Sequence, residues 1–590
     1  MMLDAFINRA EADEPVYIGE VREAFQREGV HPLSCHVTLY GGGVRRFPLR
    51  LPDWFGQREE SFVASYLHAM LYNILSSLGA ERIDLYTDQR GASLAAGLDA
   101  AFQTGRSKAE RNGYGKCLNV NERTLQALYG DARRFSFRVH DAAEEPPVTE
   151  PPAVTGDGGV FRRLPAAAAG RMVMGMDIGG TDIKLVAAAD GKLAVFKEFD
   201  WFPAGFTRAE QLVEPVLLLT RLMRAAASLC AAGRREALDA AALERGASVG
   251  QVAEGVRAME AAAGAQLRDF DAIGLCFPDV VIRNRIVGGE TYKTRGMREN
   301  PELDYEAQFA EITGLADRLA SYVTPDGAVM NTNDGPMAAF TTAVEQAAAG
   351  RDVSSGFFAH TLGTELGTGW VRPDGTIPEI PLEVYNFIVD LGSFGQRAYE
   401  ADDVRSVNNF NTGLPGTLQK YACQSGVFRL AARELPKTAP QIWQEAVERG
   451  LFVWEGGKLT VPTAPQDLRK PCLEFFMEKA EAPGGDACAE LFRKIGESLG
   501  ACWTETAYIL QPESRERTLF GRLVKSSACF RLLCEGAGRI VPELQQHAAD
   551  GSLANTPLMR QLEAHPDYTV AQFAQAVGAV YFGCLPFAGR

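Results

Sequence analysis

Runs of apolar residues near the start of the chain predict a small α+β module over residues 1–140. Residues 33–40 (LSCHVTLY) alternate like a strand and end at three glycines. Residues 62–80 predict a strongly apolar helix, and residues 82–88 (RIDLYTD) predict another strand. The next segment, residues 141–170, contains five prolines and several glycines, which interrupt any periodicity and predict a linker.

Glycine turns and apolar runs continue the pattern after the linker. Residues 172–180 and 181–190 predict two strands joined by glycines, and Asp190-Gly191 is a strong signal for a hairpin turn. Residues 207–266 are rich in Ala, Leu, Arg and Glu and predict helices. Further strands are expected at residues 270–281, 328–334, 357–372 and 518–521, and the other segments after residue 372, including 484–510 and 568–583, are mainly helical.

Composition places the chain among ordinary globular proteins. It has 590 residues, of which 46% are hydrophobic and 23% charged, and its net charge is −15. The acidic balance argues against coating of nucleic acid or of anionic membrane, so neither is expected as a partner. No signal peptide or membrane-spanning run is evident, and the 11 scattered cysteines are typical of reduced thiols, so we expect a cytoplasmic protein.

The first segment with chemical potential is Asp177-Ile-Gly179-Gly180-Thr181. Because its glycines lie between two strands, it is not a Rossmann or Walker loop, whose glycines open a helix. A glycine hairpin can still bring backbone N–H groups against phosphate oxygens, with the Thr181 hydroxyl as a further donor. Asp177 could hold Mg²⁺ through water, since this cation prefers oxygen ligands. The alternative is a plain hairpin.

Two later segments extend this interpretation. Residues 360–369 again place a glycine–threonine turn, Gly363-Thr364, between two apolar strands. Two such hairpins in a two-lobed fold can clamp one polyphosphate. Asn333 and Asp334 end a strand and begin a helix, which presents a carboxylate at a helix N-terminus, although an ordinary helix cap has the same pattern.

Together these motifs resemble the ROK family of sugar kinases in the actin/hexokinase superfamily. The resemblance covers about residues 172–590, and further motifs lie at 273–281 and 519–524. The latter resembles the family's strand and glycine near the adenosine, which implies this place for Gly521. It implies an α/β fold with two actin/hexokinase-like (ribonuclease H-like) lobes and a cleft between them, over residues 171–345 and 346–590, while the N-terminal module is separate. The helix over 568–583 can return to the first lobe.

The resemblance also implies sugar-binding residues, and here the chain departs from the family. Glu383 matches a sugar-binding glutamate, whereas Asn386 stands in place of a histidine and Gln419 in place of a second glutamate. Thr417 replaces a cysteine of the family's zinc loop, so no structural zinc is expected. The structural role of the zinc would pass to packing or hydrogen bonding around residues 400–420. Glu365 stands where the second phosphate motif has glycine.

These residues predict an ATP-dependent sugar kinase that uses Mg²⁺ and transfers a phosphoryl group to a sugar hydroxyl. Asp334 would be the general base, and Asn333, Glu383, Asn386 and Gln419 would hold the sugar. Asp177, Gly179, Gly180, Thr181, Gly363, Thr364 and Gly521 would bind the nucleotide. Two alternatives remain: a catalytically degenerate ROK-like protein that binds a sugar or other ligand for regulation, and a DNA-binding repressor. The N-terminal module shows no basic recognition helix, which argues against the repressor. A homodimer is expected, with residues 207–266 available for its interface.

Overall fold

The computed structural model describes residues 2–130, 133–289, 292–363, 366–393, 397–549 and 554–589, with α/β secondary structure throughout. The chain divides into two compact units. Unit 1 contains residues 1–152, 359–368 and 380–549, and unit 2 contains residues 153–358, 369–379 and 550–590. The α/β fold class predicted from the sequence is confirmed.

Unit 2 is built on a five-stranded mixed sheet with the strand order β11-β8-β5-β6-β7. The strands β5, β6 and β7 form an antiparallel meander, and β8 and β11 extend the other edge in parallel. The β6–β7 turn is Asp190-Gly191, both with positive φ, as the Asp-Gly signal predicts. The strands are β5 Met172–Ile178, β6 Asp182–Ala189, β7 Lys192–Asp200, β8 Phe270–Phe277 and β11 Val323–Asn333, with a small ribbon of β9 Val281–Ile282 and β10 Arg285–Ile286.

Helices cover both faces of this sheet, and successive residues of each strand point to opposite faces. Met174 and Met176 of β5 join the apolar core formed with α8. Gly175 and Gly274 point the other way, where an added Cβ would lie 1.9 Å from carbonyl oxygens of α21, so only glycine permits this close approach. The helices are α7 Gly159–Ala167, α8 Glu210–Ala231, α9 Ala240–Leu243, α10 Val249–Ala263, α11 Arg295–Arg298, α12 Tyr305–Thr313, α13 Leu315–Leu319, α14 Asp334–Ala348, α20 Pro557–Glu563 and α21 Val570–Gly583.

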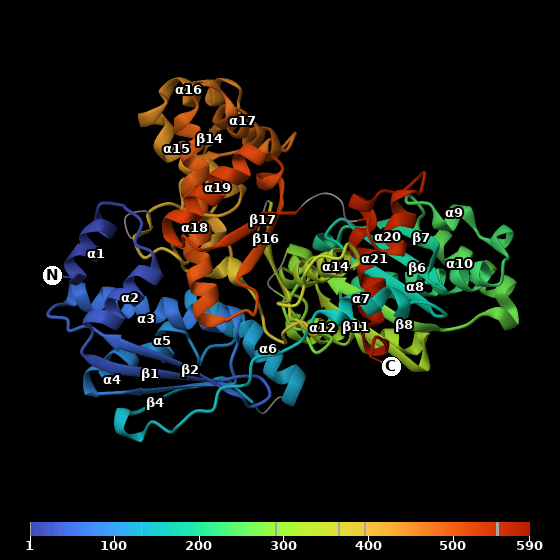
Figure 1. Ribbon diagram of the computed structural model, residues 1–590, viewed down its shortest axis with the longest axis horizontal. Helices are drawn as coiled ribbons and strands as arrows, with labels where there is room; N and C mark the ends of the chain where they lie inside the picture. Colours follow the sequence, from blue (N-terminus) through green and yellow to red (C-terminus); the bar gives the residue numbers. More distant parts are fainter. Residues whose placement is uncertain are drawn as a thin grey trace. The chain divides into compact units, whose positions relative to one another are not determined.

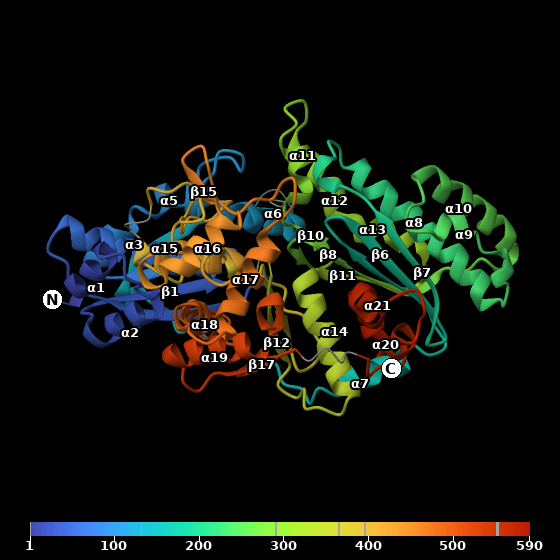
Figure 2. The ribbon, with the colours of Figure 1, turned by 90° about the horizontal axis from the view of Figure 1, so that it is seen from above.

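The helix expected over residues 568–583 is α21, and it packs against β5, β8 and α14 of unit 2 (Figures 1 and 2). Among the described residues, 570–587 form the one stretch long and apolar enough to cross a membrane, and 61% of it is buried. Its packing against the sheet accounts for this apolar character in the way usual for a core helix.

Unit 1 begins with a four-stranded sheet in the order β2-β1-β3-β4. Helices α2 and α3 lie beside this sheet (Figure 1), and α3 is buried along most of its length. The elements are α1 Met2–Glu11, α2 Ile18–Glu28, β1 His31–Thr38, β2 Val44–Leu51, α3 Gln57–Ser77, β3 Arg82–Thr87, α4 Gln89–Ala95, α5 Leu98–Ala101, α6 Cys117–Tyr129 and β4 Phe137–Asp141.

The later part of unit 1 is mainly helical, with a second sheet in the order β13-β12-β16-β17. Only residues 359–368 of β12 and β13 belong to unit 1; the outer ends of both strands belong to unit 2. The elements are β12 Phe357–Leu362, β13 Leu366–Val371, α15 Gln424–Thr438, α16 Pro440–Glu448, β14 Val453–Glu455, β15 Lys458–Thr460, α17 Arg469–Glu481, α18 Asp486–Ile509, β16 Glu516–Gly521, α19 Ser527–Ile540 and β17 Gln545–Ala548.

These units group the chain differently from the domains expected from the sequence. Residues 1–140, expected as a separate module, share one unit with residues 380–549. The segment 141–170, expected as a linker, contains helix α7 in unit 2. Buried polar contacts explain the first difference, because Arg22 of α2 pairs with Glu505 of α18, 483 residues later.

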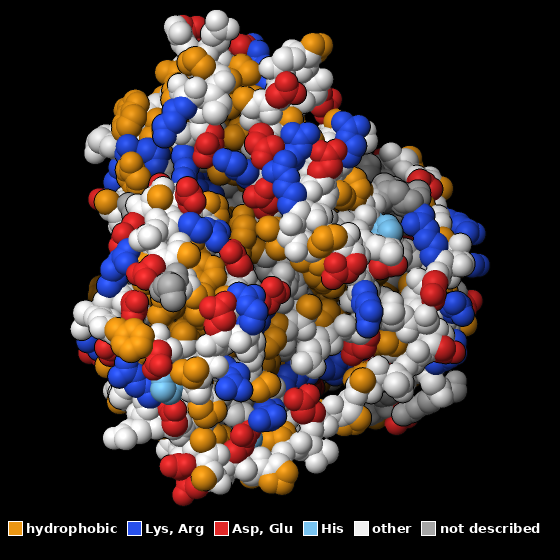
Figure 3. Space-filling view, turned by 60° about the vertical axis from the view of Figure 1, so that its left-hand side comes forward, with side chains coloured by type: hydrophobic (Ala, Val, Ile, Leu, Met, Phe, Trp, Pro, Cys, Tyr) orange, Lys and Arg blue, Asp and Glu red, His pale blue; other side chains and the backbone are white. Residues whose placement is uncertain are grey.

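Figure 3 shows one face of the molecule, where Lys and Arg side chains alternate with Asp and Glu side chains and with hydrophobic groups. Charges of both signs are interspersed on this face, which fits an ordinary solvated surface.

Candidate active site

The start of α14 carries the candidate catalytic carboxylate. Asn333 is the N-cap of this helix, and its Oδ1 accepts the backbone N–H of Gly335 at 2.9 Å. Its amide nitrogen donates to the carbonyl oxygen of Asp279 at 2.7 Å. Asp334 is therefore the first residue of the helix rather than its cap, and the capping alternative applies to Asn333. Burial raises the pKa of Asp334, while the neighbouring Lys293 opposes this shift.

Lys293 was not among the residues singled out by the sequence. Its charge acts on Asp334, its Nζ lies 3.4 Å from the carbonyl oxygen of Pro278, and its Cε would lie 3.3 Å from a Cβ at Gly180. Lys293 therefore lies beside both the glycine turn and the carboxylate. A single lysine outside any motif gives no sequence signal, because only the fold of unit 2 brings it to this place.

Asp177 lies one residue before the end of β5, next to this group. Burial raises its pKa to about 6; a hydrogen bond from the Cys276 thiol and the charge of Lys184 lower it, and the charge of Asp334 raises it further. The Cys276 Sγ lies 3.3 Å from Asp177 Oδ1. Asp177 and Asp334 thus interact electrostatically within unit 2, and both hold protons more tightly than free carboxyl groups do.

The predicted glycine turn connects β5 to β6. The N–H of Gly179 donates to the carbonyl oxygen of Asp182 at 2.8 Å, and the Gly179 carbonyl accepts the indole N–H of Trp201 at 3.0 Å. Thr181 is exposed, and its hydroxyl lies 3.2 Å from an Asp182 carboxylate oxygen. Asp182 also pairs with Lys184. The turn is fixed from both sides while Thr181 faces solvent.

The donor set of this cluster fits Mg²⁺ and phosphate. Asp177 and Asp334 are hard oxygen ligands whose mutual repulsion a cation would relieve. Lys293 beside Gly180 supplies a positive charge at a turn without side chains. Unit 2 therefore brings together Asp177, Gly179, Gly180, Asn333 and Asp334 with one further basic residue.

Three of the predicted sugar-binding residues come together in unit 1, whereas Asn333 lies in unit 2. Asn386 Nδ2 donates to Glu383 Oε2 at 3.4 Å, and Asn386 Oδ1 accepts from the Asn409 amide at 3.1 Å. The next residue, Phe410, donates its backbone N–H to Gln419 Oε1 at 3.1 Å. Glu383, Asn386 and Gln419 are thus joined through residues 409 and 410, although they span 37 positions of the sequence.

Gly521 lies in unit 1 beside Leu362, the residue before Gly363. Leu362 of β12 pairs with Gly521 of β16, and a Cβ on Gly521, whose φ is 97°, would lie 2.3 Å from the Leu362 carbonyl oxygen. The next carbonyl, that of Gly363, accepts the backbone N–H of Gln424 at 3.2 Å. Thr364 and Glu365 lie outside the described residues, so the structure places Gly363 but neither of these.

A cavity of about 570 Å³ opens beside Gln424 in unit 1. Its walls combine apolar side chains with charged ones, among them Phe410, Lys420, Gln424, Phe428, Thr463 and Arg469. Gln424 is 5% exposed, and its Oε1 has no hydrogen-bond partner in the part of the chain that the structure describes. Arg469 pairs with Asp467, and the hydrogen bond from Arg469 is the main cause that lowers the pKa of Asp467. The charge of Arg522, the residue after Gly521, lowers this pKa further. No sequence motif had indicated this cavity.

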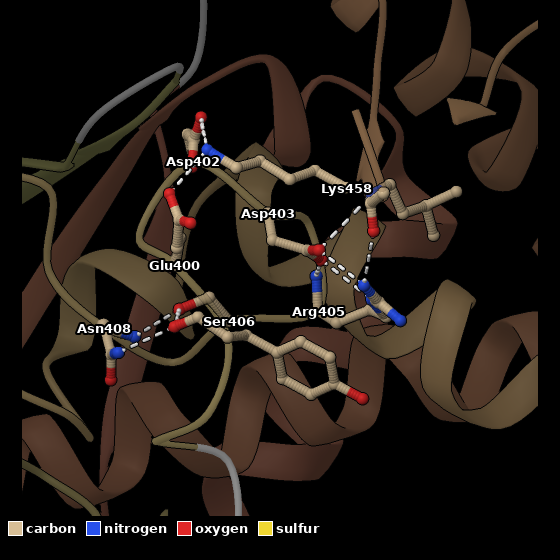
Figure 4. A network of polar contacts seen from close by, with 10 residues as sticks. Glu400, Asp402, Asp403, Arg405, Ser406, Asn408 and Lys458 are labelled. Carbon is tan, nitrogen blue, oxygen red and sulfur yellow. Dashed lines mark hydrogen bonds and ion pairs between the residues drawn. The ribbon is translucent and has the colours of Figure 1, made fainter. Parts of the chain in front are cut away.

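An ion-pair network holds the loop beside the cavity (Figure 4). Asp403 accepts from the backbone and side chain of Arg405, and Lys458 bridges Glu400 and Asp402 at 2.6 and 2.9 Å. Asn408 donates to the Tyr399 carbonyl at 2.9 Å. These contacts lie within the region, around residues 400–420, where a substitute for zinc was expected. Across the described ranges, no group of three or more His, Cys, Asp or Glu side chains suits a metal ion, and the absence of zinc stays a prediction.

No family model and no curated protein matches the chain. Solved structures similar to it include the ROK hexokinase of Thermus thermophilus, at 16% identity and a TM-score of 0.36, covering 71% of this chain and all of that one. A ROK glucokinase of Streptomyces griseus with glucose and AMPPNP has 16% identity and a TM-score of 0.34, covering 69% and 98% of the two chains. The glucokinase of Balamuthia mandrillaris with glucose has 11% identity and a TM-score of 0.38, covering 72% and 98%. These are sugar kinases, two of them from the family that the motifs resemble.

Proposed function

We propose that the protein is an ATP-dependent kinase that phosphorylates a hydroxyl group of a sugar. The observation that carries this proposal is the cluster in unit 2, where Asp334 at the start of α14 lies beside Lys293, and Lys293 lies beside Gly180 of the glycine turn. A carboxylate, a cation and a glycine turn that can approach phosphate oxygens are parts that phosphoryl transfer uses.

Asp334 accepts the proton of the attacking hydroxyl. Burial raises its pKa, which makes it a stronger base than an ordinary aspartate. Lys293 offsets the negative charge that gathers beside the turn, and backbone N–H groups of the turn other than that of Gly179, which is bonded to Asp182, orient the phosphate oxygens. Asp177 would hold Mg²⁺, which neutralises phosphate charge when bound.

The acceptor is assigned to Glu383, Asn386 and Gln419 of unit 1. Two amides and one carboxylate suit a ligand with several hydroxyl groups, each of which can donate and accept. This set carries less negative charge than the two glutamates and histidine of the resembled family. The difference favours an acceptor other than glucose as the preferred substrate.

The nucleoside of the donor is assigned to the cavity beside Gln424. This cavity adjoins Gly363 through the Gln424 N–H, and Phe410 and Phe428 supply apolar surface for a flat base. Its volume falls in the range of small-molecule sites, about 300–1,000 Å³.

Replacement of Asp334 tests the base directly. We expect Asp334→Asn to lower kcat by about 10²–10⁴-fold while sugar binding changes little, because the amide keeps the shape but cannot take a proton. The measurement is steady-state phosphorylation over a panel of sugars, with calorimetry for binding. Asp326→Asn, an exposed change earlier in β11, is the matched control. Turnover of Asp334→Asn at the wild-type rate would remove Asp334 from this role.

A second candidate is a non-catalytic sugar-binding regulator. It is favoured by the use of the Asn386 and Gln419 amide oxygens within the loop, which leaves fewer groups for a ligand. Sugar binding without ATP consumption by the wild-type protein, over the whole panel, would decide for this candidate.

A further inference from the structure

Residues 382–391, here called the acceptor loop, carry Glu383 and Asn386. The loop begins with Leu382 in the left-handed region at φ 54°, which is unfavourable for a leucine and persists only where surrounding contacts impose it. Contacts from the N-terminal part of unit 1 impose it here. The backbone N–H groups of Leu382 and Glu383 donate to the carbonyl oxygens of Ser77 and Ser76, at 2.9 and 3.1 Å.

Asn73 holds the middle of the same loop. Its Oδ1 accepts the N–H of Ile388 at 2.7 Å, and its Nδ2 donates to the Ile388 carbonyl at 3.0 Å. The Asn73 side chain thereby bonds to both backbone groups of Ile388, as a neighbouring strand would, although the two residues are 315 positions apart in the sequence. Asn73 is fully buried, so water cannot substitute for it.

The orientation of Asn73 is itself fixed by a buried charge. Its Nδ2 also lies 3.3 Å from Glu505 Oε2, and the other oxygen of Glu505 pairs with Arg22. A carboxylate accepts only, so it selects the rotamer in which the amide nitrogen faces Glu505 and the oxygen faces Ile388 N–H. Arg22, Glu505 and Asn73 thus form one chain of contacts that ends on the acceptor loop.

The end of the loop is bound in the same manner. Ile18 N–H donates to the Val389 carbonyl at 3.1 Å, and Leu391 N–H donates to the Val16 carbonyl at 2.8 Å. On its other side the loop pairs with residues 416–418, where Thr417 stands. Residues 1–152 therefore contact the loop at its start, middle and end.

We propose that residues 1–152 serve as the scaffold of the acceptor loop, and that Asn73 is a positioning residue for Glu383 and Asn386. This inference rests on the proposed function, because it assigns the loop to the acceptor. It gives the N-terminal part of the chain a role in the affinity for the sugar. Residues 400–420 contain no cysteine that could bind a structural metal ion, so contacts of this kind would take over the task of holding the loop.

The test compares Asn73→Ala with Ser65→Ala in the full chain. Ser65 lies on the same helix, and its hydroxyl donates to the Ser61 carbonyl oxygen at 2.8 Å within that helix. We expect Asn73→Ala to raise the acceptor KM about 10-fold or more, because the loss of a buried hydrogen bond lowers affinity by about this factor. The kcat and the KM for ATP should change less than about 3-fold. Amide hydrogen exchange in residues 382–391 should rise about 10-fold, with β1 unchanged.

An unchanged acceptor KM would overturn the proposal, whether or not exchange in the loop rises. If Asn73→Ala does not fold, shown by rapid exchange in β1 as well, Asn73→Ser takes its place, because a hydroxyl keeps part of the bonding. If the wild-type protein phosphorylates no sugar, the proposed function fails by itself. The dissociation constant of the best-bound sugar then replaces KM: weaker binding by Asn73→Ala supports the positioning role and equal binding overturns it.

Discussion

At the scale of single residues, the cluster in unit 2 combines groups that oppose each other's charge. Burial raises the pKa of Asp334, and Lys293 counters it. The sequence indicated Asp177, the glycines and Asp334 because each lies in a recognisable strand-and-turn pattern. It did not indicate Lys293, because only the fold of unit 2 brings this residue beside Gly180.

Lys293→Met is expected to lower kcat by about 10–10³-fold, because one preorganised charge beside the transferred group is lost. Lys293→Arg should retain more activity than Lys293→Met, since it keeps the charge. The measurement is kcat with saturating sugar and ATP, and Lys192→Met at the exposed start of β7 is the control. Equal kcat in Lys293→Met and wild type would show that this cation does not serve the reaction.

The raised pKa of Asp177 predicts a dependence of stability on pH. Between about pH 4 and 6 the unfolded carboxyl has lost its proton while the folded one, with a pKa of about 6, retains it. The folded state then binds more protons, so this group stabilises the fold at low pH and the contribution is lost as pH rises through 6. Without metal or nucleotide, wild type should lose at most about 2 kcal/mol relative to Asp177→Asn across this window.

Urea unfolding of both proteins from pH 4 to 7 measures this difference. Carboxylates that do not interact with Asp177 titrate equally in the two proteins, so the difference between the curves reports Asp177 and its coupling to Asp334. Parallel curves over the whole range would contradict the shift assigned to Asp177.

At the scale of elements, periodicity predicted what is local. The strands of the five-stranded sheet of unit 2, the long helices and the Asp-Gly hairpin follow from alternation and turn chemistry within each segment. The hairpin β14–β15 and strand β17 were missed, because each spans three or four residues and has no extended pattern. Strands β2 and β4 were missed as well, and β2 contains a proline and three arginines. The cavity beside Gln424 was missed for a related reason, since its walls come from several short segments between residues 402 and 469.

The assignment of this cavity to the nucleoside gives a prediction at the element scale. Thr463 is an exposed part of its wall, so Thr463→Trp should occupy the space without disturbing the core. We expect the KM for ATP to rise about 10-fold or more while the dissociation constant of the sugar stays the same, because an aromatic side chain competes for the volume of the base. Thr463→Ser is the control, and an unchanged KM for ATP would place the nucleoside elsewhere.

At the scale of the whole molecule, the main departure from the sequence-based domains lies in unit 1. Proline-rich residues after 145 suggested that the N-terminal part was separate. Its contacts with residues 382–391 and 505 are separated by more than 300 positions, and no local pattern reports such pairing. Arg22 and Glu505 are two ordinary charged residues in sequence, and only the fold shows them as a buried pair.

Residues 1–140 and 380–549 are therefore expected to unfold together. The Arg22 and Glu505 side chains are 8% and 0% exposed, so Arg22→Ala leaves a buried carboxylate without its partner. Such a loss costs about 3–5 kcal/mol, whereas Arg27→Ala, an exposed change on the same helix, should cost under about 1 kcal/mol.

Chemical unfolding followed by hydrogen exchange in β1 and in α18 measures both regions at once. Arg22→Ala should lower the midpoint of both by the same amount, and Arg22→Met combined with Glu505→Met should recover much of the loss because no unpaired charge remains. If β1 unfolded in an earlier transition that left α18 protected, the N-terminal part would be an independent domain, and its proposed role as a scaffold would not hold.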